Sequence, residues 1–284
     1  MQEQAPRGDP PERVIGARIR RVQLLALDFD GVISDSAPEA WLVALRTYAE
    51  LRDAPRIAAL RDRAEAQAPA EIRGDPAYRR FAEMIPLGNR AEDYAVELSL
   101  LAADRTAANQ AEFDTAFQAE SSEFLASFHR RFYEVRAELR VEDGQRWSRL
   151  LGPYPEFLEI LKRRAAGAAL AIATAKDRTS VELLLSSYGI EHLFAAERLL
   201  DKEAGRSKRG HLRALHERTG VPYPEIVFVD DKVNHLDDVA ALGVQGVLAA
   251  WGYNGEREWQ LARDRGYRVC TLGDFEAELF PPSC

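Results

Sequence analysis

The chain has 284 residues, of which 46% are hydrophobic, a composition typical of a globular protein with room for two domains. Its 38 basic and 46 acidic residues give a formal net charge of −8, which argues against a nucleic-acid-binding surface. The 2 cysteines, Cys270 and Cys284, define neither a disulfide framework nor a metal site, so we expect a protein of the reducing cytoplasm.

The N-terminal segment differs in composition from the rest of the chain. Residues 1–20 carry Pro6, Gly8, Pro10 and Pro11 among charged residues, which predicts a disordered or loosely packed tail. The segment lacks the apolar core of a signal peptide, and no later stretch is apolar enough to cross a membrane. We therefore expect no membrane partner.

The apolar run from Leu24 to Leu27 predicts a buried strand that ends in two acids. Side chains two positions apart on an extended segment face the same way, so Asp28 and Asp30 would share one small space. Their like charges would need a cation or a proton there. Gly31 permits a sharp backbone exit close to a ligand. Alone, this stretch is also consistent with an ordinary turn.

A block of different composition follows. Residues 37–150 are rich in Ala, Glu and Arg, with no Gly from 89 to 143, which predicts helices. Apolar side chains recur three, four or seven positions apart, as on one long amphipathic helix that forms a core: Phe113, Phe117, Phe124, Phe128, Phe132, Val135 and Leu139. Residues 84–90 interrupt the helical pattern and could form a loop that extends toward a substrate crevice. Arg90 suits a substrate carboxylate or distal phosphate, although it could also be a solvated helix start.

Two further strand or helix ends carry residues suited to a phosphoryl group. The run from Ala169 to Thr174 predicts a strand, with a helix beginning near Arg178. A hydroxyl and unpaired N–H groups at such a junction suit a phosphoryl oxygen, although Thr174 could simply cap the helix. Lys208 begins another helical pattern, where a lysine opposes the helix dipole and calls for an anion. Lys202 is a competing candidate.

The last acidic signal follows the apolar run from Ile226 to Val229, which predicts a third strand. Asp230 and Asp231 end it, and Asn234 follows. Oxygen ligands of this kind suit magnesium. Because ligands gather outside the carboxyl ends of parallel strands, these strand-end residues would meet in one crevice. Alternating strands and helices after residue 150 predict an α/β fold, with a late strand at Cys270. The histidines show no ligand spacing and are assigned no chemistry: His129, His211, His216 and His235.

In this order, the motifs resemble those of the haloacid dehalogenase superfamily, over residues 22–36 and roughly 151–250. The loop from Asp28 to Ile33 resembles the Asp-x-Asp-Gly loop that opens its phosphatases and phosphomutases. The sequence around Thr174 resembles that of the phosphoglycolate-phosphatase-like branch. The position of the lysine in the family's motif favours Lys208 over Lys202 as the residue that binds the phosphoryl group.

The resemblance implies a Rossmann-like parallel sheet core flanked by helices, formed by residues 21–36 and 151–284. Residues 37–150 would form an inserted, all-helical cap of the superfamily's first type. Such a cap closes over the crevice and excludes bulk water. Because a closed crevice has limited room, we expect small substrates.

The same resemblance implies a Mg²⁺-dependent phosphatase that hydrolyses a small phosphorylated metabolite through an aspartyl phosphate on Asp28. Asp30 would act as general acid and base, while Thr174 and Lys208 would hold the phosphoryl oxygens. The metal would be bound by Asp28, the main-chain carbonyl of Asp30 and Asp231.

This chain departs from the commonest family pattern after its third predicted strand. Asp230 stands in place of a glycine and Asn234 in place of a second acid, so either Asp231 alone or both acids could ligate the metal. Asn234 could orient Asp231 or a bound water through its amide. A phosphomutase and a non-catalytic binding protein of the same fold are the alternatives. Asp30 argues against a haloalkanoate dehalogenase, which lacks this second acid.

Overall fold

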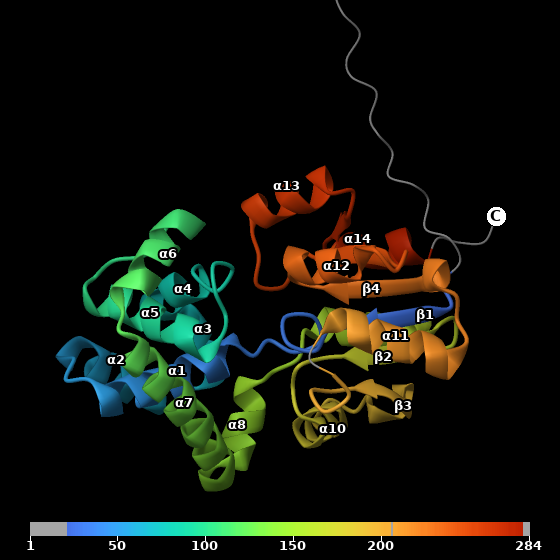
Figure 1. Cartoon of the computed structure of the whole chain (residues 1–284). Helices are drawn as coiled ribbons and strands as arrows, with labels where there is room; N and C mark the ends of the chain where they lie inside the picture. The colour runs from blue at the N-terminus through green and yellow to red at the C-terminus, as the bar shows by residue number, and fades with distance from the viewer. Residues whose placement is uncertain (1–21, 206, 281–284) are drawn as a thin grey trace, which may run out of the picture.

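The structure is a computed structural model that describes residues 22–205 and 207–280; the tail predicted at residues 1–20 and Cys284 lie outside them. Six parallel strands form one sheet in the order β3-β2-β1-β4-β5-β6 (Figure 1). The strands are β1 (Leu24–Leu27), β2 (Ala169–Ala173), β3 (Phe194–Leu200), β4 (Ile226–Asp230), β5 (Gln245–Ala249) and β6 (Arg268–Cys270). The predicted Rossmann-like core is confirmed.

Helices cover both faces of this sheet. They are α9 (Pro155–Arg164), α10 (Arg178–Ser187), α11 (Lys208–Thr219), α12 (Val233–Ala240), α13 (Glu256–Asp264) and α14 (Leu272–Leu279), with short 3-10 helices at Glu191–Leu193 and Tyr223–Glu225. Side chains of β1 alternate between the faces. Leu24 and Ala26 share a core with α11, α12 and α13. Leu25 and Leu27 share the other core with α9, α10 and α14. All four are fully buried, as expected for a central parallel strand.

The helical insert leaves the sheet after β1 and lies beside it (Figure 1). Its helices are α1 (Ala37–Leu51), α2 (Pro55–Ala66), α3 (Pro69–Gly74), α4 (Pro76–Ala82), α5 (Ala91–Ala102), α6 (Gln110–Ala119), α7 (Ser122–Glu142) and α8 (Gly144–Leu150). We call α1 to α8 the cap. None of the described helices is long and apolar enough to span a membrane.

One detail of the predicted cap is wrong. The aromatic stripe belongs to two helices, α6 and α7, and not to one long helix. Glu120 is extended between them, and its carboxylate lies 2.6 Å from the guanidinium of Arg52. Ser121 then caps α7 by accepting a hydrogen bond from the Phe124 N–H at 3.2 Å. A local capping residue therefore interrupts an apolar period that continues across the break.

Candidate active site

The carboxyl ends of three neighbouring strands meet at one point. Because β1 lies between β2 and β4, the residues that follow these strands are brought together. Asp28 follows β1, Thr174 follows β2, and Asp230 ends β4. All three side chains are buried. The strand-end residues selected from the sequence are thus placed side by side by the sheet order.

Lys208 connects these strand ends. Its ammonium lies 2.8 Å from Oδ1 of Asp28 and 3.2 Å from Oδ2 of Asp230, and it donates to the Ala173 carbonyl at 2.8 Å. Lys208 is the first residue of α11, whose N-cap is supplied by Ser207. The two acids therefore supply the negative charge that a lysine at a helix N-terminus requires. Lys202, the competing candidate, is exposed.

The second acid of the first loop faces another lysine. Oδ1 of Asp30 lies 3.2 Å from the ammonium of Lys176, whose side chain is nearly buried. Thr174 begins this second loop, and its hydroxyl accepts a hydrogen bond from the Lys176 N–H at 3.2 Å. Asp177, and not Thr174, caps α10 by accepting from the Ser180 N–H at 2.9 Å. The hydroxyl of Thr174 is therefore not used as a helix cap.

Asp231 is packed against the first loop. Gly31 has φ +82°, and a Cβ added there would overlap the Asp231 carboxylate. A Cβ on Gly252 would overlap Asp231 from another side. Oδ2 of Asp231 accepts a hydrogen bond from the Tyr253 N–H at 2.9 Å. Glycines at these two positions let Asp231 approach the Asp28–Gly31 loop closely.

His235 and Lys176 are site residues that the sequence analysis did not assign. Nδ1 of His235 lies 3.0 Å from both carboxylate oxygens of Asp230. Donor atoms of Asp28, Asp230 and His235 all lie within 4.8 Å of one another. The signal for Lys176 was its place two residues after Thr174 in the same loop. His235 gave no signal in sequence, because its contact depends on how α12 begins.

Burial and charge perturb the pKa values of the acids. Burial raises the pKa of Asp28, while Lys208 opposes the rise. Burial alone would also raise the pKa of Asp230, but Lys208 and His235 hold it below the usual range. For Asp231, burial and the charge of Asp230 raise the pKa to about 7. The pKa values of Asp28 and Asp231 are thus raised, while that of Asp230 is lowered.

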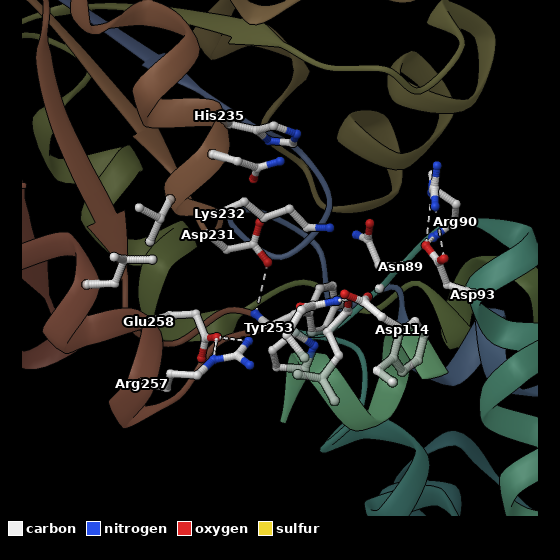
Figure 2. Close-up of a pocket in the computed structure, with 18 of the residues that line it drawn as sticks. Asn89, Arg90, Asp93, Asp114, Asp231, Lys232, His235, Tyr253, Arg257 and Glu258 are labelled. Carbon is white, nitrogen blue, oxygen red and sulfur yellow. Dashed lines mark hydrogen bonds and ion pairs between the residues drawn. The ribbon is translucent and has the colours of Figure 1, made fainter. Parts of the chain in front are cut away.

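A cleft of about 700 Å³ separates the cap from the sheet beside this cluster (Figure 2). The cap contributes residues 86–90 and parts of α5 and α6, and the sheet side contributes residues 231–235 and the segment from Tyr253 to Leu261. Asp28 and Asp30 do not line the cleft, which reaches the cluster through Asp231 and His235. Tyr253 ties the two sides together, because its hydroxyl accepts from the Ala37 N–H at 2.8 Å at the start of α1.

Comparison with known proteins identifies the family. The family model described as haloacid dehalogenase-like hydrolase matches residues 22–243, which is most of the chain. The chain belongs to the haloacid dehalogenase-like hydrolase family. The match includes the cap as well as the strands that carry the cluster.

Curated relatives match shorter segments of this hydrolase. The tyrosine-protein kinase PtkA of Mycobacterium tuberculosis is 32% identical over 91 residues, covering 32% of this chain and 31% of the relative. Human magnesium-dependent phosphatase 1 is 29% identical over 103 residues, covering 36% and 56%. Haemophilus influenzae phosphoglycolate phosphatase is 32% identical over 110 residues, covering 38% and 47%. The chain thus spans between about a third and just over half the length of these relatives.

Solved structures match over nearly the whole fold. A predicted phosphoglycolate phosphatase from Haemophilus somnus has a TM-score of 0.59 at 18% identity, covering 90% of this chain and 97% of that one. A haloacid dehalogenase-like family protein from Streptococcus pneumoniae has a TM-score of 0.58 at 13% identity, covering 90% and 97%. At such identities the likeness supports the fold, including the helical insert after β1.

The charges of the cluster fit the divalent cation implied by this hydrolase family. Asp28, Asp230 and Asp231 are buried around a single buried ammonium, that of Lys208. Lys208 contacts Asp28 and Asp230 but forms no ion pair with Asp231 among the described residues. Burial and the charge of Asp230 raise the pKa of Asp231 although Lys232 opposes the rise, and a bound cation would lower it. Hard carboxylate oxygens are also the donors that magnesium prefers.

The remaining predicted site residues lie at the cleft. Asn234 is exposed in the first turn of α12 and lines the cleft. Arg90 also lines it, but its guanidinium donates to both carboxylate oxygens of Asp93, at 3.0 and 3.1 Å. The Arg90 side chain is 70% exposed. Arg90 therefore lies at the outer edge of the cleft, with an acid already bound.

Proposed function

We propose that this hydrolase removes the phosphoryl group from a small phosphorylated metabolite, with Asp28 as the nucleophile. The observation that carries the proposal is the position of the Asp28 carboxylate. It is buried at the end of the central strand β1, and one of its oxygens lies 2.8 Å from the ammonium of Lys208. A carboxylate fixed in this way beside a cation can attack a bound phosphoryl group without having to reorient.

In the first step, an oxygen of Asp28 forms a bond to phosphorus and the bond from phosphorus to the leaving oxygen breaks. Asp30 gives its proton to that oxygen. In the second step, water attacks the phosphorus of the aspartyl phosphate, the bond from phosphorus to the Asp28 oxygen breaks, and Asp30 takes a proton from the water. Inorganic phosphate leaves, and both aspartates return to their starting states.

The residues around Asp28 would hold the phosphoryl oxygens. The hydroxyl of Thr174 and the ammonium of Lys208 approach the site from the ends of two different elements, so they can bind different oxygens of one phosphoryl group. Lys176, whose ammonium lies 3.2 Å from Oδ1 of Asp30, adds a second positive charge beside the general acid. Positive groups fixed in advance stabilise the charge that develops on the phosphoryl oxygens.

Magnesium would be held by Asp28, the main-chain carbonyl of Asp30 and Asp231. When bound, it supplies charge neutralisation for the phosphoryl oxygens. Asp230 and Asn234 are the further predicted donors next to this group. The name of the human relative, a magnesium-dependent phosphatase, supports the choice of metal.

The cap supports a small substrate. It lies over the cleft, whose volume of about 700 Å³ is in the range of small-molecule sites. The phosphoglycolate phosphatase relative supports the same substrate class. Arg90 would contact the outer end of a longer substrate. Location in a reducing cytoplasm stays a prediction from the 2 cysteines.

The test is phosphate release from a panel of phosphorylated metabolites and an aryl phosphate, with magnesium and with a chelator. The proposal predicts magnesium-dependent release of inorganic phosphate. A phosphorylated isomer in place of phosphate would identify a mutase and overturn the proposal. Tight binding without any turnover would point to a binding protein and would overturn it as well.

A further inference from the structure

Most positive side chains in the cleft are already paired with acids. Arg90 donates to Asp93, and Arg257 donates to Glu258 at 2.5 Å. His235, the third cationic or titratable side chain, lies 3.0 Å from both carboxylate oxygens of Asp230. Figure 2 shows the pairs formed by Arg90 and Arg257 on the walls of the cleft. These cations are poorly placed to bind a ligand, because each would have to leave its acid first.

Lys232 differs from them. It follows Asp231 directly and lines the cleft, but its ammonium forms no hydrogen bond or ion pair with any residue in 22–205 or 207–280. Its main chain is fixed, because the Lys232 N–H donates to Oδ1 of Asp230 at 3.0 Å. In Figure 2 the side chain reaches from the sheet side toward Asn89 of the cap. The charge of Lys232 lowers the pKa of the nearby Asp231 and Glu97, but no acid holds its ammonium by a hydrogen bond within the described residues. A fixed backbone thus presents an ammonium to the cleft with its hydrogen-bond donors free.

We propose that Lys232, opposite the amide of Asn89, binds a second anionic group on the leaving portion of the substrate and so determines specificity. The inference rests on the proposed function and deepens it. Asp231 adjoins the loop of Asp28, so a phosphoryl group at Asp28 and an anion at Lys232 lie within reach of one small molecule. The preferred substrates would be phosphomonoesters that also carry a carboxylate or a second phosphate.

A structural role for Lys232 is the competing explanation, with Asp231 or Glu97 as the acid whose charge it offsets. Asp231 accepts a hydrogen bond from the Tyr253 N–H and none from Lys232 within the described residues. Glu97 lies on α5, fully buried, and neither of its carboxylate oxygens has a hydrogen bond within the described part of the chain. Burial and the charge of Asp93 raise the pKa of Glu97 well above its usual value, while Lys232 opposes the rise. Burial therefore favours a neutral Glu97, which is a poor counter-ion for the lysine.

The test measures binding in an Asp28→Asn background, so that no turnover interferes. Calorimetry in the presence of magnesium compares three two-carbon ligands: ethyl phosphate, phosphoglycolate and ethylene glycol bisphosphate. We expect at least one of the two anionic ligands to bind more tightly than ethyl phosphate. Lys232→Met should reduce that preference by about ten- to a hundredfold, the usual effect of losing a charge-assisted hydrogen bond. The two anionic ligands distinguish a carboxylate from a phosphate subsite.

Arg257→Met, at another cation that lines the cleft, and Glu97→Gln are the matched controls and should leave the preference in place. The inference is overturned if no ligand binds, if neither anionic ligand is preferred, or if Lys232→Met weakens all three equally. It is also overturned if Arg90→Met removes the preference instead. Phosphate release by the chain with Asp28 intact is measured separately. If a Lys232-dependent preference for an anionic ligand is found without any phosphate release, only the proposed function is contradicted. If phosphate is released but no anionic ligand is preferred, only this inference is contradicted.

Discussion

The ammonium of Lys208 lies 2.8 Å from Oδ1 of Asp28, and both side chains are buried. Lys208→Met should therefore leave Asp28 and Asp230 without their shared cation. Breaking a buried pair in this way costs about 3–5 kcal/mol of unfolding free energy. Urea denaturation measures the loss. Lys202→Met, at an exposed position, is the control and should stay within about 0.5 kcal/mol of the wild type. Equal losses in the two variants would contradict a central role for the Asp28–Lys208 pair.

Gly31→Ala should lose both stability and activity. The residue has φ +82°, which costs about 1–2 kcal/mol for a side chain, and a Cβ would also displace the Asp231 carboxylate. Gly189→Ala is the matched control, because Gly189 has φ +66° but no atom lies within 4 Å of an added Cβ. It should lose only stability. Denaturation and phosphate release are measured for both variants. Unchanged turnover in Gly31→Ala would show that the close approach of Asp231 is not needed.

The pKa of Asp231 predicts how pH affects the metal-free protein. Burial and Asp230 raise that pKa to about 7, whereas an unfolded aspartate titrates near about 3.9. The folded state therefore holds an extra proton at Asp231 between these values. Its contribution to stability is fully present below the unfolded pKa and is lost as pH rises through about 7.

Asp231→Asn removes this titration. With a chelator present, the unfolding free energy of the variant minus that of the wild type should therefore increase between pH 5 and pH 8, by an amount on the order of 1–4 kcal/mol. Added magnesium should stabilise the wild type more at pH 8 than at pH 5, because binding must displace the proton. A difference between variant and wild type that does not vary with pH would contradict the raised pKa.

Thr174→Val tests the hydroxyl proposed to bind a phosphoryl oxygen. Valine has a similar shape, and the helix cap of α10 belongs to Asp177, so the loss of stability should be limited to that of the hydrogen bond from the Lys176 N–H, about 1–3 kcal/mol. Loss of one donor to the developing charge should lower kcat by about 10²–10³-fold. Thr174→Ser keeps the hydroxyl and should retain most of the activity. Steady-state kinetics on one substrate decides the matter, and equal rates in the Val and Ser variants would remove Thr174 from the scheme.

The strand ends of the site could be predicted from local sequence because each is an apolar run closed by a polar residue. Strands β1, β2, β4 and β6 were anticipated in this way. The edge strand β3 was not, because its sequence Phe194–Leu200 contains two alanines and two charged residues with no clear alternation. Strand β5 was missed as well, since it begins with a glutamine and a glycine. The edge position of β3, paired only with β2, tolerates such a pattern, whereas β5 is paired on both sides and was missed because of its short apolar run.

The partners of the site residues were harder to predict than the residues themselves. Asp93 forms an ion pair with Arg90, three positions before it, but helical spacing alone does not say that this pair forms. His235 meets Asp230 only because α12 begins immediately after the loop. The split between α6 and α7 depends on the cap at Ser121, which the aromatic period concealed. Each contact joins residues no more than five positions apart, but the spacing alone does not say that the contact forms.

The most direct test of the central claim is the rate of phosphate release by Asp28→Asn beside the wild type, on the best substrate and with saturating magnesium. Circular dichroism and the urea midpoint establish that the variant is folded. Loss of the nucleophile should lower kcat by about 10⁴-fold or more. Turnover within about tenfold of the wild type would contradict an aspartyl phosphate on Asp28.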